Sequence, residues 1–229
     1  MKYLIIGLGH YGGMLAMELT AMGHEVAGAD INSQHVDCVK DRMATSFVLD
    51  ATDETALSVL PLKSVDAVIV AIGDNFGASV RIVSLLKKLK VKHIYAQAVD
   101  EIHKAVLEAF SIDRILTPEQ DAARLLAQQL ELDGGAELFQ IDENTYVFKF
   151  VVPSKLVGYH LNELNLEQEF EMKLISLVRG KKVQNFLGIS VFEREVSNTF
   201  PEDYELQQGD ALVCYGPYAR FMQFWKSVR

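Results

Sequence analysis

The sequence predicts an α/β protein in which a doubly wound parallel sheet is followed by a smaller α+β domain. Three features of the 229-residue chain support this fold class. Short runs of branched aliphatic and aromatic residues alternate with helical patterns through the first half. A glycine-rich loop interrupts the first of these runs, and the pattern becomes β-rich in the second half. Alternating β and α elements indicate a parallel sheet that is covered on both faces.

The first half contains strand-like runs separated by helix-like ones. The strand-like runs are 3–6, 25–29, 47–49, 67–72, 93–98 and 114–116, and the helical patterns are 13–22, 35–42, 78–90 and 101–109. Strands joined by helical crossovers in this way fit a Rossmann-like nucleotide-binding architecture.

A capped helix is expected where the first half ends, over TPEQDAARLLAQQL. Thr117 suits the N-cap, Pro118 the first helical position, and Gln120 the closing position of a capping box. The polar, glycine-bearing ELDGGAE that follows is the best candidate for a domain boundary. We therefore expect a nucleotide-binding domain over residues 1–133 and a second domain over residues 134–229.

The second domain is expected to be small and α+β. Its strand-like runs are 146–152, 174–179 and 211–215. The last stretch, PYARFMQFWKSVR, predicts a short amphipathic helix with Tyr218, Phe221, Met222 and Trp225 on one face.

Composition excludes several classes of function. A net charge of −9 disfavours a nucleic-acid binder, because phosphate contacts need a basic face. Cys38 and Cys214 form no metal or redox spacing, so two reduced thiols in a cytosolic protein are expected. No apolar stretch approaches the ~20 residues that cross a bilayer, and the run 3–6 is too short for the core of a signal peptide. Any role at the membrane therefore requires a partner.

The stretch YLIIGLGHYGG places Gly7, Gly9 and Gly12 at GxGxxG spacing between a strand and a helix. This is the context that a dinucleotide-binding loop requires. Gly7 would permit the tight turn, Gly9 the approach of backbone to a diphosphate, and Gly12 the close packing of helix and strand. The diphosphate would lie against unpaired N–H groups at the positive end of the helix. The glycine triad alone also occurs in purely structural turns.

Asp30 ends the second strand, 18 residues after Gly12. A carboxylate there accepts hydrogen bonds from both ribose hydroxyls and repels a 2′-phosphate, which disfavours NADP. Ile31 and Asn32 follow it and supply no Arg for such a phosphate. The alternative interpretation is that Asp30 caps the helix that follows. Asp30, the glycine loop and the alternating pattern together predict an adenine-nucleotide site.

Two more strand ends should border the same crevice, because ligands bind beyond the carboxyl ends of the strands. LDATD places Asp50, Ala51 and Thr52 after the third strand, where Asp50 could accept a hydrogen bond from the adenine amino group. AIGDN places Gly73, Asp74 and Asn75 after the fourth, beside the phosphates. Each stretch is equally compatible with a plain turn. The complete predicted set is Gly7, Gly9, His10, Tyr11, Gly12, Asp30, Ile31, Asp50, Ala51, Thr52, Ala71, Ile72, Gly73, Asp74, Asn75 and Gln97.

The glycine loop, Asp30 and the two strand-end stretches resemble the RCK-domain (TrkA-N/TrkA-C) regulatory subunits of Trk/Ktr potassium-uptake systems. The resemblance covers the whole chain and includes IDRILTPEQDAARLLAQQL in the first half. In the second half it is weaker and is carried by NELNLEQEFEMKLISLVRG and LQQGDALVCYGP. The resemblance implies a cytosolic, non-enzymatic subunit that self-associates, from dimers up to octameric gating rings. Such a ring docks on a membrane-embedded potassium transporter at the inner face of the membrane. It binds ATP, ADP or NAD(H), and the nucleotide controls potassium flux.

The resemblance also implies roles for the helix 117–131 and for one of its residues. The helix matches the crossover helix through which two subunits pair. Glu119 matches the position that binds a divalent cation, Mg²⁺ or Ca²⁺, near the nucleotide at the dimer interface. The alternative is that Glu119 only complements the helix dipole.

The chain departs from the family at three positions. His10 stands where many members have an Arg that reaches the terminal phosphate, and a neutral imidazole is a poorer anion clamp. His10 could equally be a solvated loop residue. Gln97 stands where the family often has Lys, so the expected preference moves from ATP toward ADP or a dinucleotide. Glu167 stands where some members use Arg to bind cyclic di-AMP, so that second site is expected to be absent.

Two other functions remain as alternatives. An NAD-dependent dehydrogenase needs a proton-transfer residue beside its substrate, and His160 is the only histidine of the second half. It neighbours no acid in an obvious motif, so we interpret it as a turn residue. A transcription regulator that senses NADH needs a basic recognition helix, which the acidic chain lacks.

Overall fold

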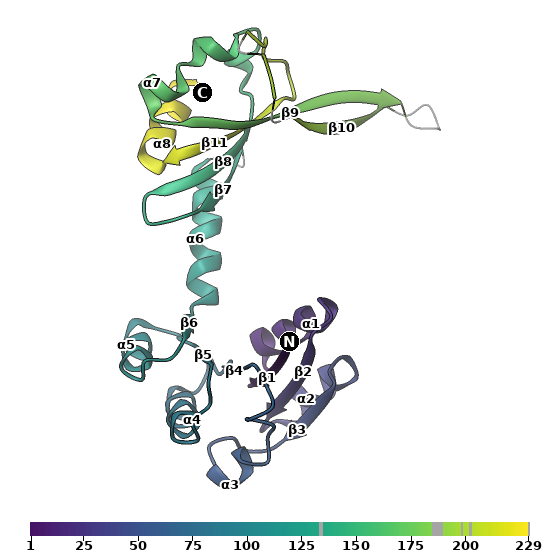
Figure 1. Cartoon of the computed structure of the whole chain (residues 1–229), viewed down its shortest axis with the longest axis vertical. Coiled ribbons are helices and arrows are strands. Elements are labelled where there is room, and N and C mark those ends of the chain that lie inside the picture. Colours follow the sequence, from purple (N-terminus) through teal and green to yellow (C-terminus); the bar gives the residue numbers. More distant parts are fainter. Residues whose placement is uncertain (133–134, 185–189, 198, 202, 229) are drawn as a thin grey trace. The chain divides into compact units, whose positions relative to one another are not determined.

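The computed structural model describes residues 1–132, 135–184, 190–197, 199–201 and 203–228 (Figure 1). The chain divides into two compact units, Met1–Ala122 and Ala123–Arg229, called unit 1 and unit 2 below. The boundary predicted between residues 133 and 134 lies outside the described residues.

Unit 1 is a parallel sheet with helices on both faces. Its strands are β1 (Lys2–Ile6), β2 (Glu25–Asp30), β3 (Thr45–Val48), β4 (Ala67–Val70), β5 (Ile94–Gln97) and β6 (Arg114–Leu116). They lie in the order β3-β2-β1-β4-β5-β6, and every neighbouring pair is parallel. This is the doubly wound order with its switch point between β1 and β4, so the predicted fold class is confirmed.

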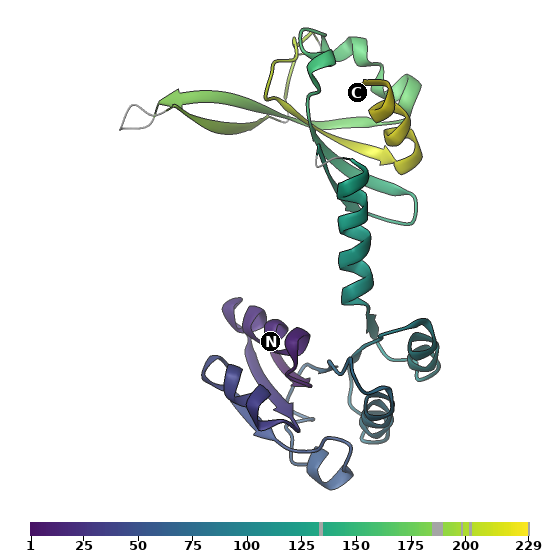
Figure 2. The same ribbon diagram turned by 180° about the vertical axis from the view of Figure 1, so that it is seen from behind.

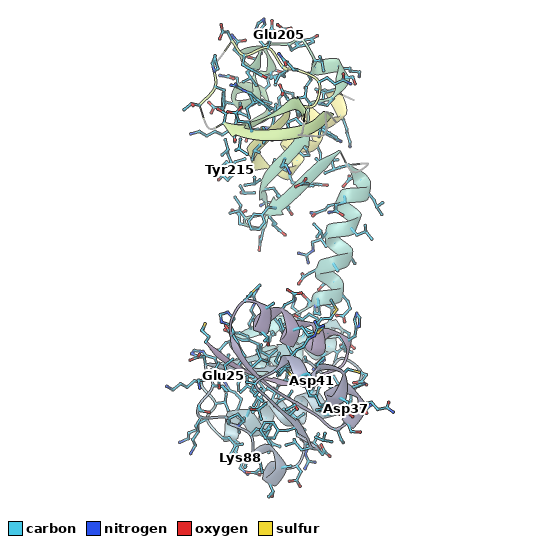
Figure 3. All side chains as sticks on the ribbon, turned by 90° about the vertical axis from the view of Figure 1, so that its right-hand side faces the viewer. Glu25, Asp37, Asp41, Lys88, Glu205 and Tyr215 are labelled. Carbon is cyan, nitrogen blue, oxygen red and sulfur yellow. The ribbon has the colours of Figure 1, made fainter. Side chains whose placement is uncertain are left out.

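The helices of unit 1 divide between the two faces of the sheet (Figure 2). They are α1 (His10–Ala21), α2 (Ser33–Val39), α3 (Glu54–Leu57), α4 (Phe76–Lys88) and α5 (Glu101–Ala109), with a 3₁₀ turn η1 (Lys40–Arg42). One core contains residues of α1 and α2, and the other contains residues of α3, α4 and α5. Because the sheet is covered twice, all four residues of β4 are buried. Charged side chains such as Glu25 and Lys88 stand at the surface (Figure 3).

Two differences from the predicted helices have local causes. The helix α1 begins at His10 rather than at residue 13. Its first turns contain Gly12 and Gly13, which have poor helix propensity but are buried against the sheet, so packing overrides propensity. The helix α3 was not predicted, since four residues are too short to show helical periodicity; the carboxylate of Asp53 caps it by accepting from the N–H of Ala56 at 2.9 Å.

Helix α6 (Pro118–Glu131) begins at the proline, as predicted, and spans the division between the units. The hydroxyl of Thr117 donates to the carboxylate of Asp121 at 3.2 Å.

Unit 2 is built on an antiparallel sheet. Its strands are β7 (Ala136–Gln140), β8 (Thr145–Val151), β9 (Lys173–Gln184), β10 (Ser190–Ser197) and β11 (Ala211–Pro217), in the order β10-β9-β11-β8-β7. Its helices are α7 (Leu166–Phe170) and α8 (Tyr218–Val228), with 3₁₀ turns η2 (Ser154–Leu156) and η3 (Leu161–Leu164). The arrows of β9 and β10 extend as a long hairpin away from the rest of unit 2 (Figure 1).

The core of unit 2 is aromatic. The ring of Phe221 from α8 stacks on Phe148 from β8 with centroids 4.0 Å apart, and Phe150 and Trp225 lie 5.7 Å from it. These contacts confirm the predicted amphipathic helix, which buries Phe221 and Trp225 in the core.

Candidate nucleotide-binding site

A cavity of about 730 Å³ opens where the strands of unit 1 end. Because the strands are parallel, the loops that follow β1 to β5 and the start of α6 converge at one edge of the sheet. The cavity is lined by Ile6, Gly7, Gly9, His10, Tyr11, Ala29, Asp30, Ile31, Asn32, His35, Leu49, Asp50, Ala51, Thr52, Ala71, Ile72, Gly73, Asp74, Asn75, Ala78, Ile82, Gln97 and Glu119.

The glycine loop brings bare backbone to this cavity. Gly7 has φ of +96°, and a Cβ there would come within 2.6 Å of the carbonyl oxygen of Ala71. A Cβ on Gly12 would overlap the carbonyl oxygen of Gly7, so α1 and β1 pack closely only without it. Gly9 is the N-cap of α1, supplies no side-chain cap, and has open space where a Cβ would stand. The first N–H groups of α1 are therefore available to an anion, which is the arrangement that holds a diphosphate.

Asp30 is buried at the end of β2 and is held from several directions. Its Oδ2 accepts from the backbone N–H of Leu8 at 2.6 Å, and its Oδ1 accepts from the N–H of Asn32 at 2.7 Å. The ring Nδ1 of His35 lies 3.2 Å from Oδ2. A carboxylate has about four acceptor positions, and these three partners leave about one position for a ribose hydroxyl. The helix cap is Asn32, which accepts from the N–H of Gln34, and not Asp30.

Asp50 lies at the end of β3 and folds onto its own loop. Its Oδ1 accepts from the N–H of Thr52 at 2.9 Å and from the hydroxyl of Thr52 at 2.7 Å. These hydrogen bonds lower the pKa of Asp50, so the group stays ionised at neutral pH. The Nε of Arg81 donates to the carbonyl oxygen of Thr52 at 2.8 Å and braces the same loop.

The loop after β4 presents Gly73, Asp74 and Asn75 to the cavity. The amide oxygen of Asn75 accepts from the N–H of Ala78 at 3.0 Å and so caps α4. Asp74 and Asn75 are exposed in the chain.

The end of the cavity near β5 and α6 is formed by Tyr11, Gln97 and Glu119. The Nε2 of Gln97 donates to Oε1 of Glu119 at 3.0 Å. Gln97 is only 2% exposed, and its Oε1 has no hydrogen-bond partner among the described residues. Burial raises the pKa of Tyr11, with a further contribution from Glu119, so the phenol keeps its proton.

The structure brings the predicted residues together around the cavity, with one exception. All of them line the cavity apart from Gly12, which lies behind the loop and packs against Gly7. His10 is exposed and lines the cavity, so both interpretations of it stay open.

Several lining residues were not predicted. They include His35, Leu49, Ala78 and Ile82. His35 is the member with chemistry, and its position five residues after Asp30, near the start of a helix, was the available signal. The apolar members could not be identified, because they resemble any other core residue.

A second hollow, of about 640 Å³, lies over α5 and is lined by Glu101, Ile102, Ala105, Val106, Ala109 and Phe110. Its lining is almost entirely apolar, so it lacks the set of polar side chains that would hold a ribose and its phosphates. It therefore does not compete as a nucleotide site.

Two further predictions concern metal and the second unit. Within the described ranges, no group of three or more His, Cys, Asp or Glu side chains is arranged to hold a metal ion, and Glu119 as a metal ligand stays a prediction. The Nδ1 of His160 lies 2.6 Å from the carbonyl oxygen of Asp203, which accounts for this histidine as a turn residue. Among the helices formed by the described residues, none has the length and hydropathy of a membrane span.

Comparison with known proteins places the chain in a family. Residues 3–118 match the TrkA-N domain. Over 227 residues the chain is 30% identical to Ktr system potassium uptake protein C of Bacillus subtilis (strain 168). The aligned region covers 99% of this chain and 97% of the relative.

Two solved structures share the fold along nearly the whole chain. The GsuK RCK domain has a TM-score of 0.61 at 15% identity, over 99% of this chain and 47% of that one. The GsuK channel bound to NAD has a TM-score of 0.57 at 14% identity, over 99% of this chain and 39% of that one. The chain thus spans less than half of the length of these structures.

These matches confirm the resemblance drawn from the motifs. The relative is a potassium uptake protein, which agrees with the prediction that the chain is a regulatory protein and not an enzyme. The chain belongs to the TrkA-N domain family, as a relative of the Ktr system potassium uptake proteins.

Proposed function

We propose that this chain is the regulatory subunit of a Ktr-type potassium-uptake system. An adenine nucleotide, which we take to be ADP, ATP or NAD(H), binds the cavity of unit 1 and changes potassium flux through a membrane-embedded transporter. The full-length similarity to a potassium uptake protein supports the partner. The observation that carries the ligand is the cavity itself, which is lined both by the start of α1, whose N-cap Gly9 has no side chain, and by the buried carboxylate of Asp30.

The residues of the cavity fit such a nucleotide from end to end. The N–H groups at the start of α1 suit the diphosphate, and the remaining acceptor position of Asp30 suits a ribose hydroxyl. Asp50, held ionised by Thr52, is a suitable acceptor for the adenine amino group. The structure of NAD with a channel of the same fold, at 14% identity, is consistent with this proposal for the fold as a whole.

Regulation requires two states of an assembly that differ in affinity for the ligand, because a ligand with equal affinity for both shifts nothing. We propose that copies of the chain pair through α6 and assemble into a ring, from a dimer up to an octamer. On α6, Leu125, Leu126 and Leu130 are between 47% and 67% exposed, which favours their burial by another copy. Glu119, at the start of the same helix, is the proposed ligand for Mg²⁺ or Ca²⁺ there. Such an assembly would work at the cytoplasmic face of the membrane through its partner.

The test is binding of ADP to the full chain by titration calorimetry. Asp30→Asn keeps the shape of the side chain and one oxygen for the N–H of Leu8, but it removes the charge and the oxygen that accepts from the N–H of Asn32. The affinity for ADP should fall at least about tenfold, because hydrogen bonds to charged groups are the stronger ones. Asp37→Asn is the matched control, since Asp37 is exposed, pairs with Lys40, and does not line the cavity. Figure 3 shows Asp37 at the surface of unit 1.

Two further readouts connect binding to function. Light scattering of the same preparation should give a mass above the 25.6 kDa of one chain. In cells that lack their own copy, potassium uptake restored by the natural chain should lose its nucleotide response with Asp30→Asn. Equal ADP affinity for both variants and the natural chain would rule out the ribose role of Asp30.

A further inference from the structure

Three groups occupy the carboxylate of Asp30. Its Oδ2 accepts from the N–H of Leu8 at 2.6 Å and lies 3.2 Å from Nδ1 of His35. Its Oδ1 accepts from the N–H of Asn32 at 2.7 Å. An ionised carboxylate only accepts, so Nδ1 of His35 carries a proton and donates to Oδ2. Because each oxygen has about two acceptor positions, Oδ2 is full and Oδ1 keeps about one.

A nucleotide that bonds to Asp30 through both ribose hydroxyls needs two acceptor positions. The position left on Oδ1 serves one hydroxyl, so the second hydroxyl requires a position on Oδ2. The carboxylate is also only 9% exposed, although it lines the cavity. One of the groups in contact with Asp30 must therefore move before a ribose can reach both oxygens.

Of the three donors, His35 is the one that can leave. The donors of Leu8 and Asn32 are backbone N–H groups, one in the glycine loop and one at the N-cap of α2, so they move only with the chain. His35 lies in the first turn of α2, and its side chain is 45% exposed and lines the cavity. Its ring can therefore rotate to another staggered position while the backbone stays in place.

We propose that His35 occupies the position of a ribose hydroxyl on Asp30 and is displaced by the nucleotide. The ring is thus a built-in competitor of the ligand, and it opposes binding by about the strength of its own hydrogen bond. This inference rests on the proposed function and adds a specificity residue to the same site. Because only the bond to ribose is contested, His35 weakens the binding of a ribonucleotide and does not affect a nucleotide that lacks the ribose hydroxyls.

The test is calorimetric titration of the full chain with ADP and with 2′,3′-dideoxy-ADP, which lacks both hydroxyls. His35→Ala removes the ring, and His35→Phe keeps an aromatic ring that cannot donate. Both variants should raise the affinity for ADP relative to dideoxy-ADP at least about threefold, the effect of one modest hydrogen bond.

His93→Phe is the matched control. The Nδ1 of His93 lies 2.8 Å from Oδ1 of Asp113, so the pair is of the same kind, but neither residue lines the cavity. This variant should keep the ratio of ADP to dideoxy-ADP affinity that the natural chain shows.

The outcomes separate the inference from the proposed function. A ratio that is unchanged or lower in His35→Ala overturns the inference, because the ring would then ignore the ribose or bind it. A rise that His35→Phe does not share overturns it too, since the bulk of the ring and not its hydrogen bond would then compete. If ADP binds no more tightly than dideoxy-ADP in the natural chain and in both variants, the ribose role of Asp30 fails as well. If neither ligand binds, the proposed function fails.

A crystal structure of the natural chain with ADP tests the displacement without any variant. The Nδ1 of His35 should lie beyond hydrogen-bond distance from Oδ2 of Asp30, and both ribose hydroxyls should contact the carboxylate. If the 3.2 Å contact between His35 and Asp30 is retained in the complex, the inference is overturned.

Discussion

Unit 1 and unit 2 both enclose an apolar core, but they differ in where their loops go. In the parallel sheet of unit 1 the loops after successive strands leave from the same edge, and they meet around one cavity. In the antiparallel sheet of unit 2, β7 and β8 are joined directly and the rings of α8 fill the inner face. The comparison shows that the position of the candidate site follows from the direction of the strands, before any side chain is considered.

The largest expected effect separates the stability of unit 2 from ligand binding by unit 1. Phe221→Ala removes a fully buried ring that contacts Phe148, Phe150 and Trp225. The free energy of unfolding of unit 2 should fall by about 3–5 kcal/mol, as for other buried aromatic residues. Trp225 is the single tryptophan of the chain, so its fluorescence in a urea titration reports on unit 2 alone.

The control for this prediction is Phe139→Ala, since Phe139 is 70% exposed on β7. It should change the free energy of unfolding by no more than about 0.5 kcal/mol. ADP affinity should be the same for both variants. A loss of ADP binding in Phe221→Ala would show that the two units do not act separately.

The next effect distinguishes two glycines within the loop of unit 1. Gly12→Ala should lower the free energy of unfolding by about 1–3 kcal/mol, the usual cost of overpacking, because its Cβ would overlap the carbonyl oxygen of Gly7. Gly9→Ala meets open space and an ordinary φ of −59°, so the fold should be unaffected. Its Cβ would instead face the cavity and reduce ADP affinity.

Unfolding of unit 1 is followed by hydrogen exchange of the amides in β1 and β4, and binding by calorimetry. The prediction requires a destabilised Gly12→Ala and a stable Gly9→Ala that binds ADP weakly. If Gly9→Ala bound ADP as tightly as the natural chain, the diphosphate would not lie against this backbone.

The parts of the site that sequence could predict are those that depend on local patterns. The glycine spacing, Asp30 at a strand end and the AIGDN loop each follow from a short stretch, and the structure brings them to one cavity. The contacts that were not predicted join residues far apart in the sequence. The hydrogen bond from Leu8 to Asp30 and the pair Gln97–Glu119 both require the folded register.

The same distinction explains the fold. The central strand β4 of unit 1 is buried on both faces, and both it and β1 stand out from the sequence. In contrast, β7 was missed because it is an edge strand with Glu137, Phe139 and Gln140 exposed. Periodicity reports burial, so an edge strand with an exposed face carries little signal.

The smallest expected effect is an opposite pH dependence of the two units, and it comes from one histidine in each. His103 lies on α5 and is fully buried, with its ring against that of Phe76 on α4. Burial lowers the pKa of His103. Its unfolded form takes up a proton near the ordinary value of 6.5, whereas its folded form resists protonation. The stability that His103 gives to unit 1 is therefore complete above about pH 6.5 and declines as the pH falls below it.

In unit 2 the sign is reversed, because the carbonyl oxygen of Asp203 accepts from the ring of His160 and raises the pKa of this exposed histidine. That contribution is complete below about pH 6.5 and is lost as the pH rises through the folded pKa. Between about pH 5.5 and 6.5 the carboxylates with lowered pKa values, such as Asp50 and Asp113, do not titrate. His103→Leu should remove the decline in hydrogen-exchange protection of unit 1 in this window and leave the Trp225 signal unchanged. His160→Asn should affect only the Trp225 transition, and a common sign for both units would mean that these two histidines do not control it.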